Sequence, residues 1–274
     1  MSKQPAAAIQ AGDCIKHMRT MPKQSIPLIV TDPPYNIGYS YDQYDDKLDK
    51  AEYLAWCDEW LILATGLLTD DGTMWIVIND QYVSEIDVAV KRLGLVKRSH
   101  VIWHYTFGQN SGKKLTPSHA HLLYYVKSEK QFTFNPLRVP SARQMLYNDK
   151  RAGSAGRNPD DVWILRPQWC PEGFYASMDT WHIPRINGTF KERAGTPNQL
   201  PEQLVGRIIS MCSNAGDVVF DPFAGSGTVP AVAKKLGRGY LGVELSAAYT
   251  ISANARIESA VVGQELAGSV PQGS

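Results

Sequence analysis

The chain has little cysteine and no long apolar run among its 274 residues. Its four cysteines form no C-x-x-C pair, so neither a zinc cluster nor a disulfide framework is indicated, and we expect no metal site. No window approaches the roughly 18 consecutive apolar residues of a membrane-spanning helix. Residues 1–13 also lack the apolar core of a signal peptide. These absences favour a cytoplasmic protein without a membrane partner.

The formal net charge is only +1, but the charges are unevenly distributed along the chain. Residues 91–193 hold 17 Lys and Arg against 7 Asp and Glu, whereas the rest of the chain holds 11 basic and 20 acidic residues. The same segment contains five of the six histidines and 14 of the 27 aromatic residues. This pattern indicates a surface for a polyanion, with a solvated basic face as the alternative.

Short apolar runs alternate with stretches of helical periodicity at both ends of the chain. Strands are predicted at 27–32, 72–80, 99–105, 120–128, 217–222 and 239–245, and helices at 50–68, 84–94, 201–213, 228–237 and 246–259. The alternation predicts an α/β fold with a doubly wound, mostly parallel sheet. Residues 129–196 show little periodicity and predict an irregular insertion. Residues 262–274 predict a disordered tail.

The run VVFDPFAGSGT places a glycine-rich turn between a strand and a helix. Gly225 and Gly227 permit a tight turn and a close approach of the backbone to a ligand. Asp221 ends the preceding strand and Glu244 ends the next one, where an acid accepts hydrogen bonds from ribose hydroxyls. Pro230 occupies the third glycine position of a dinucleotide fingerprint, and no phosphate-binding P-loop is present. The unit therefore favours a nucleoside-containing cofactor over a plain strand-to-helix turn.

Asp32, Pro33, Pro34 and Tyr35 follow the first predicted strand. The Asp32 carboxylate and the Pro33 carbonyl are two rigidly spaced acceptors that match the two hydrogens of a planar amine. Accepting both hydrogens stabilises the positive charge that develops when the nitrogen attacks. Tyr35 can offer a flat face to the ring that carries the amine. These residues predict a catalytic site for an aromatic amine, with a strand-terminating turn and a surface tyrosine as the alternative.

Together the two motifs resemble those of the amino-methylating DNA methyltransferases that use S-adenosylmethionine. DPPY at 32–35 is similar to their catalytic motif and DPFAGSGT at 221–228 to their cofactor motif, and NQLPEQLVGRII at 198–209 resembles the helix before the cofactor strand. The order of the motifs is similar to the β class, which implies a permuted, Rossmann-like class I methyltransferase fold with a target-recognition insertion. The expected cofactor-binding residues are Asp13, Cys14, Asp32, Asp221, Pro222, Phe223, Ala224, Gly225, Ser226, Gly227, Thr228, Glu244 and Leu245.

The permutation gives IQAGDCIKHM at 9–18 a role as the strand beside 239–245. Asp13 then falls at the position of the acid that contacts the cofactor's adenine, with Cys14 beside it; the alternative is an N-terminal turn before a helix. The expected organisation is a catalytic half at 1–128, a target-recognition insertion at 129–196, a cofactor-binding half at 197–261 and a tail at 262–274.

The resemblance implies that the substrate base is flipped out of duplex DNA and that the basic segment contacts the phosphates. The candidate DNA contacts are Lys113, Lys114, Arg138, Arg143, Lys150, Arg151, Arg157, Arg166, Arg185, Lys191 and Arg193. The turn at Asn36, Ile37 and Gly38 is expected to carry the chain over the bound base, and the histidines of TPSHAH are expected to be structural.

In the family, Asp before Pro-Pro favours adenine and Ser favours cytosine, so Asp32 implies methylation of adenine N6 in double-stranded DNA. The alternatives are an N4-cytosine enzyme, an RNA or protein amine methyltransferase on the same fold, and a catalytically silent DNA-binding module. A homodimer and a cognate restriction endonuclease are considered as further partners.

Overall fold

The computed structural model describes residues 8–39, 41–105, 112–113, 115–138, 147–151, 156–163 and 199–267. The strands are β1 Ala8–Ala11, β2 Ile26–Thr31, β3 Leu68–Ile78, β4 Val96–His104, β5 His119–Val126, β6 Val162–Trp163, β7 Val218–Asp221 and β8 Gly239–Glu244. The helices are α1 Cys14–Thr20, α2 Lys50–Leu67, α3 Val83–Arg92, α5 Glu202–Cys212, α6 Thr228–Lys235 and α7 Ala247–Ser259. The strands and helices predicted from periodicity are therefore present, most with ends shifted by a few residues.

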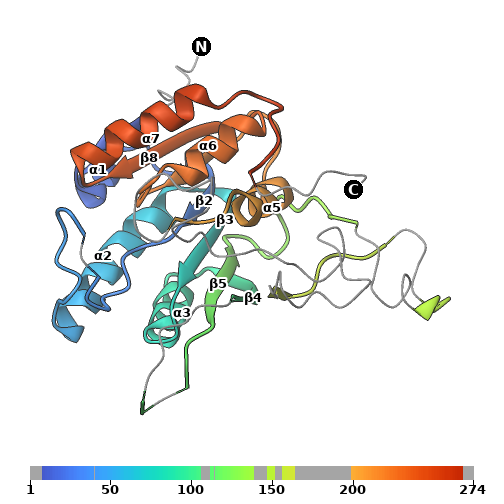
Figure 1. Ribbon diagram of the computed structural model, residues 1–274, viewed down its shortest axis with the longest axis horizontal. Helices are drawn as coiled ribbons and strands as arrows, with labels where there is room; N and C mark the ends of the chain where they lie inside the picture. Colours follow the sequence, from blue (N-terminus) through green and yellow to red (C-terminus); the bar gives the residue numbers. More distant parts are fainter. Residues whose placement is uncertain are drawn as a thin grey trace.

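The strands form one sheet in the order β1-β8-β7-β2-β3-β5-β4-β6. Figure 1 labels β8, β2, β3, β5 and β4 of this sheet. All neighbouring strands are parallel except where β5 pairs antiparallel with β3 and β4. The N-terminal strand β1 lies beside β8, as the permutation predicts, and β7 pairs with β2. The predicted doubly wound, mostly parallel sheet of a class I methyltransferase is confirmed.

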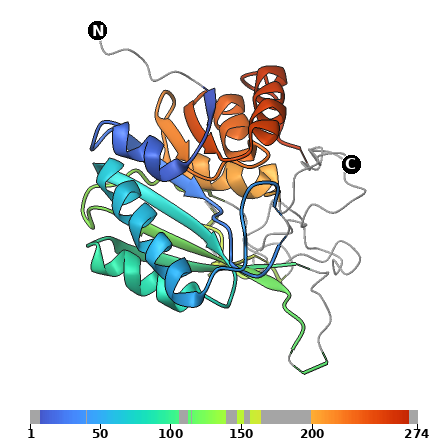
Figure 2. The same ribbon diagram turned by 90° about the vertical axis from the view of Figure 1, so that its left-hand side faces the viewer.

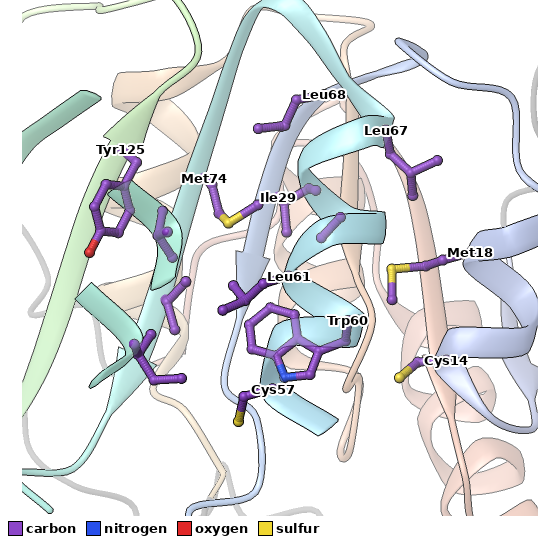
Figure 3. Packing of buried hydrophobic residues seen from close by; sticks show 14 of the residues in the cluster. Cys14, Met18, Ile29, Cys57, Trp60, Leu61, Leu67, Leu68, Met74 and Tyr125 are labelled. Atoms are coloured by element: carbon purple, nitrogen blue, oxygen red, sulfur yellow. The ribbon is translucent and has the colours of Figure 1, made fainter. Parts of the chain in front are cut away.

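Helices cover both faces of this sheet (Figure 2). Successive residues of β2 point to opposite faces, so Ile29 packs under α1, α2 and α3 while Leu28 and Val30 pack under α5 and α6. Trp60 and Leu61 of α2 meet the sheet from the first side, where Figure 3 shows them beside Ile29 and Met74. β2 is a central parallel strand that is buried on both faces, and this explains why its sequence is a continuous run of apolar residues.

The predicted insertion contributes a strand to the edge of the sheet. β6 pairs parallel with β4, and the side chain of Trp163 is 2% exposed and stacks with Trp75 at a centroid distance of 6.4 Å. The expectation of an irregular segment is therefore corrected at this point, because an aromatic pair holds two residues in the sheet. The candidate contacts Lys114, Arg143, Arg166, Arg185, Lys191 and Arg193 lie outside the described residues.

The start of the predicted tail packs against the C-terminal helices instead of being disordered. Leu266 fills the space beside Gly206 of α5, where an added Cβ would lie 2.1 Å from the Leu266 Cδ1 atom. The backbone amide of Ala267 donates a 2.8 Å hydrogen bond to Glu202 Oε2. Packing of Leu266 and this hydrogen bond hold the start of the predicted tail against α5. In the described part of the chain, no helix has the length and apolar character to cross a membrane.

A buried ion-pair cluster joins the three C-terminal helices. Glu202 at the start of α5 accepts hydrogen bonds from Lys235 Nζ of α6 at 2.7 Å and from Arg256 Nη2 of α7 at 2.9 Å. The side chains of Glu202 and Lys235 are only 4% and 8% exposed. Arg256 also donates to Thr228 Oγ1 at 2.9 Å, so the cluster reaches the glycine turn.

Replacing Glu202 by Ala should destabilise the protein strongly, because two buried cations would lose their partner. We expect the free energy of unfolding to fall by about 3–5 kcal/mol. Urea denaturation followed by circular dichroism measures this change. The control is Glu59→Ala, which removes an exposed pair with Arg19 and should have little effect. Equal and small effects of both substitutions would contradict the role of the cluster.

Candidate functional site

A cavity of about 310 Å³ lies at the carboxyl ends of β1, β8, β7 and β2. This edge is where open α/β sheets bind ligands. Of the predicted residues, the cavity is lined by Asp13, Cys14, Asp32, Pro33, Pro34, Tyr35, Asp221, Pro222, Phe223, Ala224, Gly225, Ser226, Thr228, Glu244 and Leu245. Residues from the two ends of the chain thus meet in one site, because β7 inserts between β8 and β2.

The glycine turn bends around the carboxylate of Glu244. Gly225 has a φ of 50° and donates its backbone amide to Glu244 Oε2 at 2.9 Å. The amide of Ser246 donates to Oε1 at 2.8 Å, so each carboxylate oxygen holds one backbone N–H. Burial raises the pKa of Glu244, while these two amides favour its ionised form. A left-handed φ at Gly225 explains the requirement for glycine at this position.

Gly227 does not line the cavity, and its role as a cofactor contact stays a prediction. It precedes α6 with a φ of 72°, and an added Cβ would lie 2.9 Å from the Cβ of Ala253 in α7. Glycine is needed there for the close approach of α7 and for the backbone conformation.

Asp13 and Cys14 occupy the turn between β1 and α1. Asp13 Oδ1 accepts the amides of Ile15 at 2.8 Å and Lys16 at 3.2 Å, so it caps α1 and also borders the cavity. Asp13 can therefore both begin the helix, as the turn interpretation expects, and face the cofactor cavity, as the resemblance implies. Burial raises the pKa of Cys14 to about 12, so its thiol is a neutral wall of the cavity and not a nucleophile.

The catalytic motif is held from two sides. The Tyr35 hydroxyl donates to Asp32 Oδ1, and the Tyr53 hydroxyl of α2 donates to the Pro34 carbonyl at 2.8 Å. The Pro33 carbonyl accepts no hydrogen bond from the described residues. Burial, followed by the nearby Asp32, raises the pKa of Tyr35 well above its ordinary value. Tyr35 thus orients Asp32, a role that the sequence interpretation of a stacking ring did not include.

The cavity wall is strongly acidic. Its acidic residues are Asp13, Asp32, Asp42, Asp221 and Glu244, and the described lining contains no Lys, Arg or His. Asp221 is 3% exposed, and burial raises its pKa to about 8, with further repulsion from Asp32 and Glu244. Gathering several acidic groups around one cavity without a counter-charge is unfavourable, so the cavity is suited to a cationic ligand.

A second, smaller cavity of about 50 Å³ adjoins Asp32 on its other side. It lies at the ends of β3, β5 and β4, whereas the larger cavity lies toward β7 and β8. The two cavities share Asp32, Tyr35, Gln199 and Leu200. The smaller one is further lined by Asn79, Trp103, Tyr105 and Ala120. Asp32 therefore stands on the boundary between a large acidic cavity and a small aromatic one.

The segment after the catalytic motif forms a wall of the larger cavity that sequence reasoning missed. Tyr41, Asp42, Gln43 and Tyr44 line it. The turn at residues 36–38 leads into this segment and lines neither cavity, and its expected position over the base stays a prediction. The run YDQY at 41–44, with an acid between aromatic residues, was the sequence signal that could have indicated this wall.

In the described residues, no group of three His, Cys, Asp or Glu side chains is arranged to hold a metal ion.

This sheet, with an acidic glycine-turn cavity beside an Asp-Pro-Pro-Tyr motif, defines a class I methyltransferase. A family model described as DNA methylase, for the N6-adenine and N4-cytosine enzymes, matches residues 26–255. The chain belongs to this family of S-adenosylmethionine-dependent DNA methyltransferases. The order and identity of the two motifs had predicted this membership.

Relatives of known name cover most of the chain. Type II methyltransferase M.HpaI of Haemophilus parainfluenzae is 35% identical over 90% of this chain and 73% of its own length. The DNA adenine methyltransferase YhdJ of Escherichia coli is 31% identical over 89% of this chain and 80% of its own length.

Solved structures share the fold at lower identity. The M1.HpyAVI–SAM complex superimposes with a TM-score of 0.61 at 22% identity, covering 91% of this chain and 98% of that one. The cytosine-N4-specific PvuII DNA methyltransferase gives a TM-score of 0.65 at 16% identity, covering 93% and 89%.

The family's cofactor, S-adenosylmethionine, fits the larger cavity. It carries a sulfonium, an ammonium and one carboxylate group, and its net positive charge suits the acidic wall of this cavity. Its adenosine part needs a close backbone approach and acceptors for hydroxyls, which Gly225 and Glu244 offer.

Cofactor affinity should rise between pH 6 and pH 8. The raised pKa of Asp221 means that its carboxyl group is largely protonated in the free protein, and a bound cation favours the ionised form. Binding therefore releases protons, and each released proton increases affinity by at most about tenfold per pH unit. Isothermal titration calorimetry with S-adenosylmethionine measures the slope.

Two comparisons test the cause of this pH dependence. Adenosine, which lacks the positive groups, should show a much smaller slope with the same protein. Asp221→Asn should remove most of the slope for S-adenosylmethionine. An equal slope for both ligands would contradict the assignment to cavity carboxylates.

Proposed function

We propose that the protein transfers the methyl group of S-adenosylmethionine to the exocyclic N6 of an adenine flipped out of double-stranded DNA. The observation that carries this proposal is the position of Asp32 between the acidic cavity and the small aromatic cavity. Membership of the DNA methylase family supports the reaction class, and the adenine relative supports the base.

Asp32 and Pro33 are proposed as the acceptors for the target amine. S-Adenosylmethionine supplies an electrophilic methyl group when bound. The Asp32 carboxylate and the Pro33 carbonyl hold the two hydrogens of the amine, so the nitrogen lone pair is directed at the methyl carbon. Tyr35 and Tyr53 act through this motif as positioning residues, because their hydroxyls bind Asp32 and the Pro34 carbonyl. Holding the acceptor nitrogen in line supplies much of the rate.

The smaller cavity is proposed as the inner end of the base-binding site. Trp103 and Tyr105 stand edge-to-face at a centroid distance of 5.3 Å and offer apolar walls to a flat base. Asn79 adds an amide that can pair with a base edge. A base entering from β3, β5 and β4 approaches Asp32 from the side opposite to the cofactor cavity, as in-line transfer requires.

The basic middle of the chain is proposed to bind the DNA phosphates. In its described part, Arg151 and Arg157 are paired with Asp149 and Asp160, while Arg138 and Lys150 are exposed. The alternative substrate is cytosine N4, which the same two acceptors can hold. Methylation of RNA amines is a weaker alternative, because the family match is to DNA enzymes.

Further predictions concern the partners, the location and the domain division of the protein. The names of the Type II relatives support a cognate restriction endonuclease as a functional partner. A homodimer and a cytoplasmic location remain predictions from the sequence. The predicted division into 1–128, 129–196 and 197–261 also remains a proposal, with the first and last segments sharing one sheet.

Asp32→Ala should abolish methyl transfer while leaving cofactor affinity within about tenfold. Loss of one preorganised electrostatic group typically lowers the rate by about 10²–10³, and here an acceptor and its alignment are lost together. Transfer of tritium from labelled S-adenosylmethionine to genomic DNA measures the rate, and calorimetry measures binding. Asp71→Ala, an exposed site away from both cavities, is the matched control. Loss of binding together with transfer would show that Asp32 is misassigned.

Expression in a host free of DNA methylation tests the base and the substrate together. Long-read sequencing of its DNA should show N6-methyladenine in one short sequence context, and digestion with mass spectrometry should confirm the modified nucleoside. N4-methylcytosine in its place would move the assignment to the alternative. No modified base in DNA, with transfer to RNA, would overturn the proposal.

A further inference from the structure

The loop that follows the catalytic motif, described at residues 36–39 and 41–49, is closed by hydrogen bonds between its ends. Asp46, only 1% exposed, accepts the amides of Asn36 at 2.8 Å, Ile37 at 3.1 Å and Tyr39 at 2.9 Å. The Asn36 side chain accepts the Leu48 amide at 2.7 Å and donates to the Leu48 carbonyl at 2.9 Å. Both ends of the loop are therefore held together, and its tip has a defined position.

The tip of this loop crosses to the cofactor-binding half. The Ser246 hydroxyl donates to Asp42 Oδ2 at 2.7 Å. Ser246 also donates its backbone amide to Glu244 Oε1 at 2.8 Å and caps α7. One serine therefore bridges the carboxylates of Asp42 and Glu244, which belong to segments at opposite ends of the chain.

The two bridged carboxylates face the same space. Both line the larger cavity, and Asp42 contributes to the raised pKa of Glu244 and of Tyr249. The second carboxylate oxygen of Asp42 accepts no hydrogen bond from the described residues. Each oxygen of Glu244 already holds one backbone amide. A ligand with two adjacent hydroxyl groups would supply donors to both acids and reduce their mutual repulsion.

We propose that Asp42 is a further cofactor-binding residue, which shares the ribose hydroxyls of S-adenosylmethionine with Glu244. This inference rests on the proposed function and extends its cofactor site to the loop that begins at the catalytic motif. Because the loop ends are fixed by Asp46 and Asn36, a cofactor held by Asp42 also holds the segment that follows Tyr35.

The alternative is that Asp42 only fastens the loop to Ser246. A fastening role and a ribose contact differ in their dependence on the hydroxyls of the ligand. The probes are S-adenosylmethionine, S-adenosylhomocysteine and an S-adenosylhomocysteine analogue without the 2′- and 3′-hydroxyls. Dissociation constants are measured by calorimetry for the wild type, Asp42→Ala and Asp42→Asn. The matched control is Asp45→Ala, an exposed acid of the same loop that does not line the cavity.

Asp42→Ala should weaken S-adenosylhomocysteine by about tenfold, because the lost contact is to the ribose. It should weaken S-adenosylmethionine by at least as much, because the sulfonium also loses one carboxylate of the acidic cavity wall. It should leave the affinity for the dihydroxyl-free analogue within about twofold of the wild type. Asp42→Asn should show the same selectivity with a smaller loss, and Asp45→Ala should bind all three ligands like the wild type.

Equal weakening of all three ligands by Asp42→Ala would overturn the ribose contact and leave only the fastening role. Affinities of Asp42→Ala equal to those of the wild type for all three ligands would overturn both the ribose contact and the fastening role. If the wild type binds neither S-adenosylmethionine nor S-adenosylhomocysteine, the proposed function itself fails. A wild type that binds both, with an insensitive Asp42→Ala variant, defeats only this inference.

Discussion

The pairing of β7 with β2 is the constraint on which the site depends. It aligns Leu28 with Val219 and Ile29 with Phe220, so the two strands end at the same edge. Asp32 and Asp221 then face one cavity although the basic segment separates them in the chain. β2 is buried between two helical layers, and this packing fixes the register that brings catalytic and cofactor motifs together.

The electrostatics of the cavity follow from this convergence. Parallel strands that end in acids place several carboxylates at one edge, and burial raises the pKa values of Asp221 and Glu244. The free protein thus holds partly desolvated acids that a cationic cofactor can stabilise. The same convergence leaves Asp32 at the border with the smaller cavity, where its partner Tyr35 keeps the carboxylate oriented.

Much of this arrangement was predictable from the sequence. Periodicity predicted most of the strands and helices, and the two motifs predicted the class of protein. The order of the motifs predicted that β1 pairs with β8, which brings Asp13 to the cavity.

The loop with Asp42 was not predicted, because its position depends on the buried Asp46 and on Ser246 more than 200 residues away. The packing of Gly227 against Ala253 was not predicted either, because a glycine motif does not distinguish a ligand contact from helix packing. The order of Leu266 depends on a groove at Gly206 that no local pattern reveals.

The most direct test of the account is a crystal structure with sinefungin, in which an amine-bearing carbon replaces the methyl-bearing sulfur of the cofactor. If Asp32 stands between the cofactor and the base, this amine should lie within hydrogen-bond distance of the Asp32 carboxylate or the Pro33 carbonyl. It should also point toward the smaller cavity at Asn79 and Trp103. An amine directed away from Asp32, with the nucleoside outside the cavity formed by Gly225 and Glu244, would contradict the account.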